Sequence, residues 1–124
     1  VHVGSRLPAA NTTMGRVLLA DLDEETLIAL YRDADAQRTT RNTAPGMTDL
    51  MTQWRADRNS DTVTQVGSFE AGITSVAAPL RDMSGKTVAA INATSATEGR
   101  QAVPPEVRRA LEDTAARISR LLGN

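Results

Sequence analysis

The sequence lacks cysteine and is poor in histidine and aromatic residues, and each shortage removes a class of site. Without cysteine the chain forms no disulfide and offers no thiolate to a metal ion. Its aromatic residues are Tyr31, Trp54 and Phe69, too few for a platform on which nucleic-acid bases stack. His2 is the single histidine, which leaves a Ser-His triad or a histidine metal site almost nothing to work with. We therefore expect no metal and no cofactor.

Long apolar runs and an excess of basic charge are also missing. The net charge is −1 at pH 7, so no general positive field attracts nucleic acid. No apolar run approaches the roughly 18 residues that span a bilayer, and no charged-then-apolar signal peptide opens the chain. We expect a soluble cytoplasmic domain, or a fragment of one, without a membrane partner. Its 124 residues suffice for one domain with a single core.

The stretch at residues 7–20 predicts a helix start that is open to an anion. Pro8 biases its predecessor toward extended backbone, and Thr12 or Thr13 can cap the helix that follows. After Gly15 comes the apolar run Val17-Leu18-Leu19-Ala20, which predicts a short buried helix. Its first backbone N–H groups point outward and can receive a carboxylate or phosphate. The alternative is an ordinary capped helix in which Gly15 allows close packing.

Two further helices are expected in the first half. Asp23 is a plausible N-cap for the second, whose apolar residues recur at helical spacing and predict one buried face: Leu27, Ile28, Leu30 and Tyr31. The third begins at Met47 or Thr48, carries Leu50, Met51 and Trp54, and ends in a polar turn at residues 57–61. Between them, residues 38–46 read as a surface loop, whose two arginines either bind an anion or are simply solvated.

The second half changes to the alternation of strands. Residues 62–66, 72–80 and 87–94 are predicted strands, and Ser84-Gly85 is the turn of a hairpin between the last two. Pro79 prefers a sheet edge or a strand end. Asn92 and Thr94 share one face of their strand, where they either meet solvent or line a small polar pocket.

A closing amphipathic helix completes an α+β pattern of helices packed on an antiparallel sheet. Pro104 and Pro105 open this helix, and its apolar stripe predicts core packing: Val107, Ala110, Leu111, Ala115, Ile118, Leu121 and Leu122. No carboxylate is paired with a base, and the Gly-x-Ser-x-Gly motif is absent. We expect a ligand-binding or interaction domain and no enzyme.

Four separated segments, in order, resemble the C-terminal effector-binding domain of the IclR family of bacterial transcription regulators. They are residues 4–20, with Leu-Pro, Gly-Arg and Val-Leu-Leu-Ala, and residues 38–43, 70–80 and 82–93. The closing helix fits as well. The amino-acid sequence of the first motif is most similar to that of regulators of aromatic-acid catabolism in the β-ketoadipate pathway.

This resemblance implies a GAF/PAS-like fold, a curved antiparallel sheet flanked by helices. It also implies a ligand sensor in residues 1–124, incomplete at its N-terminus, whose winged helix-turn-helix lies upstream. Operator DNA would then be contacted only through that missing domain, and the regulator would self-associate as a dimer or tetramer. The effector would be a small carboxylate or aromatic acid. The alternative is a GAF-like oligomerisation module with no small-molecule ligand.

The resemblance assigns effector-binding positions to seven residues. Thr13 and Met14 occupy a site of backbone donors just before Gly15, and the strands contribute small polar side chains: Gln65, Ser75, Asn92 and Thr94. Donors of this kind hold an anion without the cost of burying a lysine. Met14 would close an apolar wall over the ligand.

Two positions depart from the family pattern. Gln65 stands where the family usually carries an acidic cluster. An amide donates as well as accepts, so this exchange would tolerate a more strongly anionic ligand. Residues 59–62 replace a Gly-aromatic pair, which changes the local turn.

Overall fold

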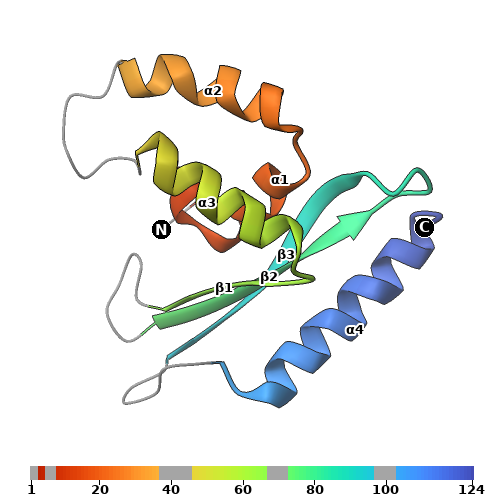
Figure 1. Ribbon diagram of the computed structural model, residues 1–124. Helices are drawn as coiled ribbons and strands as arrows, with labels where there is room; N and C mark the ends of the chain where they lie inside the picture. Colours follow the sequence, from red (N-terminus) through yellow and green to blue (C-terminus); the bar gives the residue numbers. More distant parts are fainter. Residues whose placement is uncertain (1–2, 5–7, 37–45, 67–72, 97–102) are drawn as a thin grey trace.

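The computed structural model describes residues 3–4, 8–36, 46–66, 73–96 and 103–124. The elements in these ranges are the 3-10 turn η1 (Ala9–Asn11), α1 (Thr13–Ala20), α2 (Glu24–Ala36), α3 (Met47–Arg58), β1 (Val63–Val66), β2 (Ile73–Arg81), β3 (Thr87–Ala96) and α4 (Pro105–Leu121). The strands form an antiparallel sheet in the order β1-β2-β3. Figure 1 shows α1, α2 and α3 on one side of this sheet and α4 on the other. The predicted α+β class is confirmed.

Helix α1 lies between the sheet and the two helices α2 and α3. Its Val17 packs with Val63 and Ala77 of the sheet, whereas Leu19 packs into a cluster formed by α2 and α3, with Leu27, Leu50, Met51 and Trp54. The opposite face of β2 packs on α4, in a core of Val76, Ala78, Leu80, Val103, Leu111 and Ala115. An eight-residue helix is too short to be stable alone, so its packing on both sides supports α1.

The predicted caps of the first two helices are confirmed. The Thr12 hydroxyl accepts a hydrogen bond from the backbone N–H of Gly15 at 3.0 Å and so caps α1. The Asp23 carboxylate accepts from the N–H of Thr26 at 2.7 Å at the start of α2. Helix α3 begins at Met47. Residues 38–45 of the predicted arginine loop lie outside the described residues.

Three of the predicted apolar faces are narrower than expected. Leu30 of α2 is 55 % exposed, whereas Leu27 of the same helix is fully buried in the shared core. Leu18 of α1 is 44 % exposed, on the side turned away from Val17 and Leu19. On α4, Ala110 is exposed within the stripe, and Leu121 at its end is 87 % exposed.

The end of β2 explains the change at the end of α4. There the contact is polar: Ser119 is buried, and its hydroxyl accepts from the backbone N–H of Arg81 at 3.0 Å. Leu121 and Leu122 follow that contact and remain exposed. The continuous apolar stripe predicted for α4 is therefore wrong beyond Ile118.

The hairpin between β2 and β3 turns where the sequence predicts it. Gly85 has φ +83°, a backbone conformation that favours glycine. The Asp82 carboxylate accepts from the hydroxyl and the N–H of Ser84 at 2.6 and 2.9 Å. These two bonds lower the pKa of Asp82. Their stabilising effect is therefore present at neutral pH and lost as the pH falls through that lowered pKa.

Pro79 also lies where its chemistry predicts. Strand β2 is central, but its pairing with β1 stops at Ala77, which pairs with Val63. Pro79 pairs only with Ala90 of β3 and, near the end of its strand, sits at a local edge where a missing N–H costs no ladder bond.

The described helices include none that is both long and apolar enough to span a membrane.

Replacing Gly15 by alanine is expected to destabilise the fold by about 2 kcal/mol, as overpacking of a tight contact does. A Cβ at this position would meet the backbone oxygen of Ala9, its Cα at 2.5 Å and the Thr12 hydroxyl at 2.6 Å, so η1 would have to move. Urea unfolding measures the change. Gly46→Ala is the matched control, because its Cβ meets nothing within 4 Å. Equal stability of the two variants would contradict the tight packing of η1 on α1.

Candidate functional site

The sheet brings most of the predicted strand residues onto one face. Gln65 pairs with Ser75, and Ser75 pairs with Thr94, so the three form one row across the sheet. Asn92 pairs with Ala77 in the next row on the same face. Because Ala77 packs against Val17, this face is the one that α1 covers.

The polar side chains of this face are linked to one another. The hydroxyls of Ser75 and Thr94 lie 3.0 Å apart, within hydrogen-bond distance, and the Asn92 amide donates to the Thr94 hydroxyl at 3.3 Å. Ser75 is half-buried, whereas Asn92 and Thr94 are exposed. We refer to Ser75, Asn92 and Thr94 as the strand triad. It is open to solvent on the α1 side of the sheet, as the first of the two alternatives left by the sequence expects.

The start of α1 presents backbone donors on this same side. The N–H of Gly15 is taken by the Thr12 hydroxyl, and that of Arg16 by the Thr12 carbonyl at 2.9 Å. For the N–H groups of Thr13 and Met14, no acceptor is found among the residues that the structure describes. The positive end of the helix therefore offers two donors. Thr13 is buried and Met14 is 41 % exposed.

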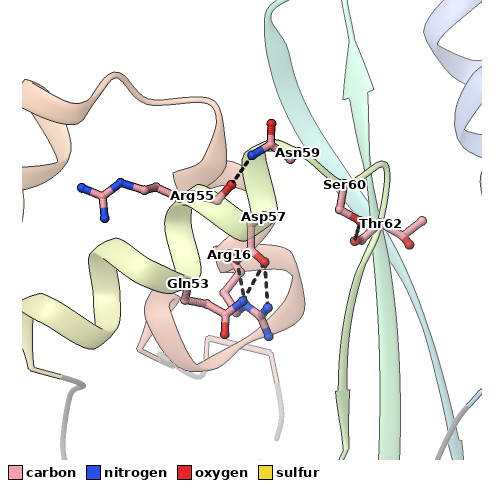
Figure 2. A network of polar contacts seen from close by, with 7 residues as sticks. All are labelled: Arg16, Gln53, Arg55, Asp57, Asn59, Ser60 and Thr62. Carbon is pink, nitrogen blue, oxygen red and sulfur yellow. Dashed lines mark hydrogen bonds and ion pairs between the residues drawn. The ribbon is translucent and has the colours of Figure 1, made fainter.

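A buried ion pair fixes α1 to α3. The Arg16 guanidinium binds the Asp57 carboxylate with two bonds, Nε to Oδ2 at 3.0 Å and Nη2 to Oδ1 at 2.8 Å. The two side chains are 12 % and 7 % exposed. Gln53 also donates to Asp57 Oδ1, at 3.0 Å, as Figure 2 shows. This pair is not predicted by the sequence pattern, which indicates a turn at Asp57, whereas α3 continues to Arg58.

The far end of α1 is held by α3 as well. The Trp54 indole N–H donates to the Leu22 carbonyl at 3.2 Å. Arg58 donates to the carbonyls of Leu22 and Ala20 at 2.6 and 3.1 Å, and its guanidinium stacks over Trp54, 4.6 Å from the ring centre. Cations near the carbonyl end of a helix are favoured by its dipole.

Gln65 connects the sheet to the start of α1. In the amide orientation that gives both ends a partner, Nε2 donates to the Asn11 carbonyl at 3.0 Å, and Oε1 accepts from Arg16 Nη1 at 3.2 Å. Beside these residues lies a cleft of about 170 Å³ between η1, α1 and α3, which Gln65, Arg16, Trp54 and Asp57 help to line. The structure thus places Gln65 on the predicted face, next to the ion pair.

The turn after α3 is closed by its own side chains. The Asn59 amide donates to the Arg55 carbonyl at 2.9 Å, and the Ser60 hydroxyl donates to the Thr62 carbonyl at 2.8 Å, both drawn in Figure 2. These bonds shape the turn in which the sequence departs from the family pattern. The described residues contain no group of three or more acidic or histidine side chains that could hold a metal ion.

Replacing Asp57 by alanine is expected to destabilise the protein by about 3 kcal/mol, because it leaves the buried Arg16 charge uncompensated. Thermal or urea unfolding measures the loss. The matched control is Glu24→Gln, which breaks an exposed ion pair with Arg55 at 3.7 Å and is expected to cost less than about 0.5 kcal/mol. A small cost for Asp57→Ala, comparable to that of the control, would contradict the central place of this pair.

Comparison with known proteins supports the resemblance seen in the sequence. Residues 1–120 match the family model of the bacterial transcriptional regulator IclR C-terminal domain. The chain is 34 % identical over 97 residues to the p-hydroxybenzoate hydroxylase transcriptional activator of Acinetobacter baylyi, covering 78 % of this chain and 36 % of that protein. It is 35 % identical over 92 residues to the Pca regulon regulatory protein of Pseudomonas putida, covering 74 % and 32 %.

Solved structures agree with this assignment. The PobR inducer-binding domain from Acinetobacter, a double mutant in complex with 3-hydroxybenzoic acid, has a TM-score of 0.77 and 32 % identity, over 96 % of this chain and 71 % of that one. The Agobacterium tumefaciens repressor BlcR has a TM-score of 0.79 and 27 % identity, over 100 % and 51 %. The chain spans about a third of the length of the curated relatives it matches. From its sequence and its fold, this chain belongs to the IclR family of bacterial transcriptional regulators, through the match of residues 1–120 to the C-terminal domain of that family.

Proposed function

We propose that this chain senses a small organic acid, whose carboxylate binds between the start of α1 and the strand triad. The observation that carries the proposal is that both donor sets lie on the same side of the sheet (Figure 1). Gln65 bonds to Asn11, next to the cap of α1, and lies in the same row as Ser75 and Thr94. The N–H groups of Thr13 and Met14 and the polar groups of the strand triad then converge on one anion.

The donors favour a singly charged acid with a polar substituent, and not the more strongly anionic ligand that the exchange at Gln65 would by itself tolerate, because the Gln65 amide is bonded to the protein. Hydroxyls, an amide and helix N–H groups stabilise a carboxylate through dipoles, and the nearby Arg16 charge is already matched by Asp57. Relatives that are 34 % and 35 % identical over the aligned residues are named as regulators of p-hydroxybenzoate hydroxylase and of the Pca regulon. The structure of a related domain holds 3-hydroxybenzoic acid. We therefore propose a hydroxybenzoate or a related aromatic acid as the effector.

Gly15 contributes to this site through its size. Its own N–H is taken by Thr12, and the absence of a Cβ lets η1 approach α1 closely. This packing fixes the position of the backbone that carries the N–H donors of Thr13 and Met14. Met14, the exposed residue of this turn, is available to cover the apolar body of a ligand.

The rest of the protein would turn binding into transcriptional control. We propose a winged helix-turn-helix upstream that contacts operator DNA, assembly as a dimer or tetramer, action in the cytoplasm, and no catalytic activity. Effector binding alters operator affinity only if the effector favours one arrangement of the regulator over another. The alternative function is oligomerisation alone, in a GAF-like module that binds no small-molecule ligand.

Hydroxybenzoates are expected to raise the melting temperature of the protein, while unrelated acids such as glyoxylate and pyruvate are not. At about a hundred times its dissociation constant, a ligand adds roughly 2.7 kcal/mol of stability. Asn92→Ala and Ser75→Ala should abolish the shift, because each removes a hydrogen-bonding group from the triad. Differential scanning fluorimetry, followed by calorimetric titration, gives both measurements.

Ser95→Ala is the matched control for these variants. Ser95 lies on β3 between Thr94 and Ala96 and points to the opposite face, so the shift should persist in this variant. If no acid stabilises a folded protein, the oligomerisation module becomes the better proposal. An undiminished shift in Asn92→Ala and Ser75→Ala would place the ligand elsewhere.

A further inference from the structure

From the geometry around the ion pair we infer that Gln65 is a positioning residue: it fastens the start of α1 to the sheet and so sets the distance between the two donor sets. This inference rests on the proposed effector site. It differs from a direct role of Gln65 as a ligand contact, since its amide is engaged with the protein at both ends.

The first contact acts on the backbone that carries the helix donors. Gln65 Nε2 donates to the Asn11 carbonyl at 3.0 Å, the last residue of η1, immediately before the cap residue Thr12. Movement of this carbonyl displaces the N–H groups of Thr13 and Met14, which follow two and three residues later. A bond from β1 to Asn11 therefore fixes the donors of α1 relative to the strands.

The second contact makes the attachment rigid. Gln65 Oε1 accepts from Arg16 Nη1 at 3.2 Å, while two other nitrogens of the same guanidinium are held by Asp57. A planar guanidinium bound at two points has little freedom to rotate. The remaining nitrogen, Nη1, then orients the amide of Gln65. Asp57, Arg16 and Gln65 together therefore link α3, α1 and β1.

This arrangement requires a neutral side chain that both donates and accepts. A carboxylate at position 65 would accept from Arg16 but would have no proton for the Asn11 carbonyl. It would also add a negative charge beside Asp57, in a cleft that Asp49 lines as well. Glutamine supplies the donor without that charge. The geometry at the start of α1 thus gives a physical reason for glutamine, and not an acidic residue, at position 65.

Three variants of the intact protein test the inference. Gln65→Met keeps the length of the side chain but removes both hydrogen bonds, and Gln65→Glu keeps the bond from Arg16 but removes the donor to Asn11. Gln53→Met is the matched control: Gln53 also bonds to Asp57, at 3.0 Å, but both residues belong to α3, so this bond does not attach α1 to the sheet. Each variant is compared with the wild type at pH 7.5.

The first measurement needs no ligand. Hydrogen exchange of the Gly15 and Arg16 amides reports on the start of α1, because both amides are bonded to Thr12. Exchange at these amides should rise about fivefold to tenfold in Gln65→Met and Gln65→Glu, as expected for loss of one hydrogen bond. Exchange in α4 should not change. Gln53→Met should resemble the wild type.

The second measurement is the affinity for 4-hydroxybenzoate and 3-hydroxybenzoate by calorimetric titration. Both Gln65 variants should bind about tenfold more weakly, and Gln53→Met should stay within about twofold of the wild type. Weaker binding with unchanged exchange at Gly15 and Arg16 would overturn the inference in favour of a direct ligand contact. Faster exchange throughout the chain, or no change in either measurement, would overturn it too.

The two proposals fail separately. If the wild type binds neither benzoate, the proposed effector class is wrong, while the exchange measurement still decides whether Gln65 fastens α1 to the sheet. If benzoates bind but exchange at α1 does not respond to Gln65, the proposed function stands and the positioning role is lost.

Discussion

The buried bond between Arg16 and Asp57 is the interaction on which the arrangement of this domain depends. Removing two charges from water is costly, and only good geometry and further hydrogen bonds compensate for it. Here the guanidinium bonds to both carboxylate oxygens, and Gln53 and Gln65 occupy further positions around the pair. An apolar pair could pack as well, but it would not fix the rotation of α1. The ion pair selects one orientation of this helix.

Helix α1 needs such support because a helix of eight residues is too short to be stable alone. It contributes one apolar residue to the sheet and another to the helical layer, Val17 and Leu19, and its far end is held by Trp54 and Arg58. Each attachment uses a different chemistry: apolar packing, an ion pair, and hydrogen bonds to free carbonyls. Together they place a helix start, with two backbone donors, on the side of the sheet that also carries the polar strand triad. That combination is the physical basis for proposing an anion site here.

The sequence predicts those features that depend on neighbours along the chain. The caps at Thr12 and Asp23 and the turn at Gly85 follow from local hydrogen bonds and backbone preference, and the structure contains all three. The alternation of strands likewise placed Asn92 and Thr94 on a common face. The family resemblance drew attention to Ser75 and Gln65, which no local pattern distinguishes.

What the sequence does not predict depends on contacts between distant residues. Arg16 and Asp57 are 41 positions apart, and an arginine in a helix gives no sign of which carboxylate it meets. Leu30 and Leu121 fit a helical stripe, yet whether each is buried depends on what lies opposite, and the structure leaves both exposed. The engagement of Gln65 at both ends is of this kind too, since it requires Asn11 of η1 and Arg16 of α1 to lie next to the same side chain.

Because β1 is short, the row of Gln65, Ser75 and Thr94 also affects the register in which this strand pairs. Four residues of β1 pair with β2, so few ladder bonds oppose a slip of the strand. A slip by one residue would turn Gln65 toward the α4 side and bring Thr64 or Val66 to the α1 side, because side chains alternate along a strand. Neither of those can join Arg16 to Asn11 as an amide does. The contact that organises the candidate site thus also distinguishes the native strand register from its nearest competitors.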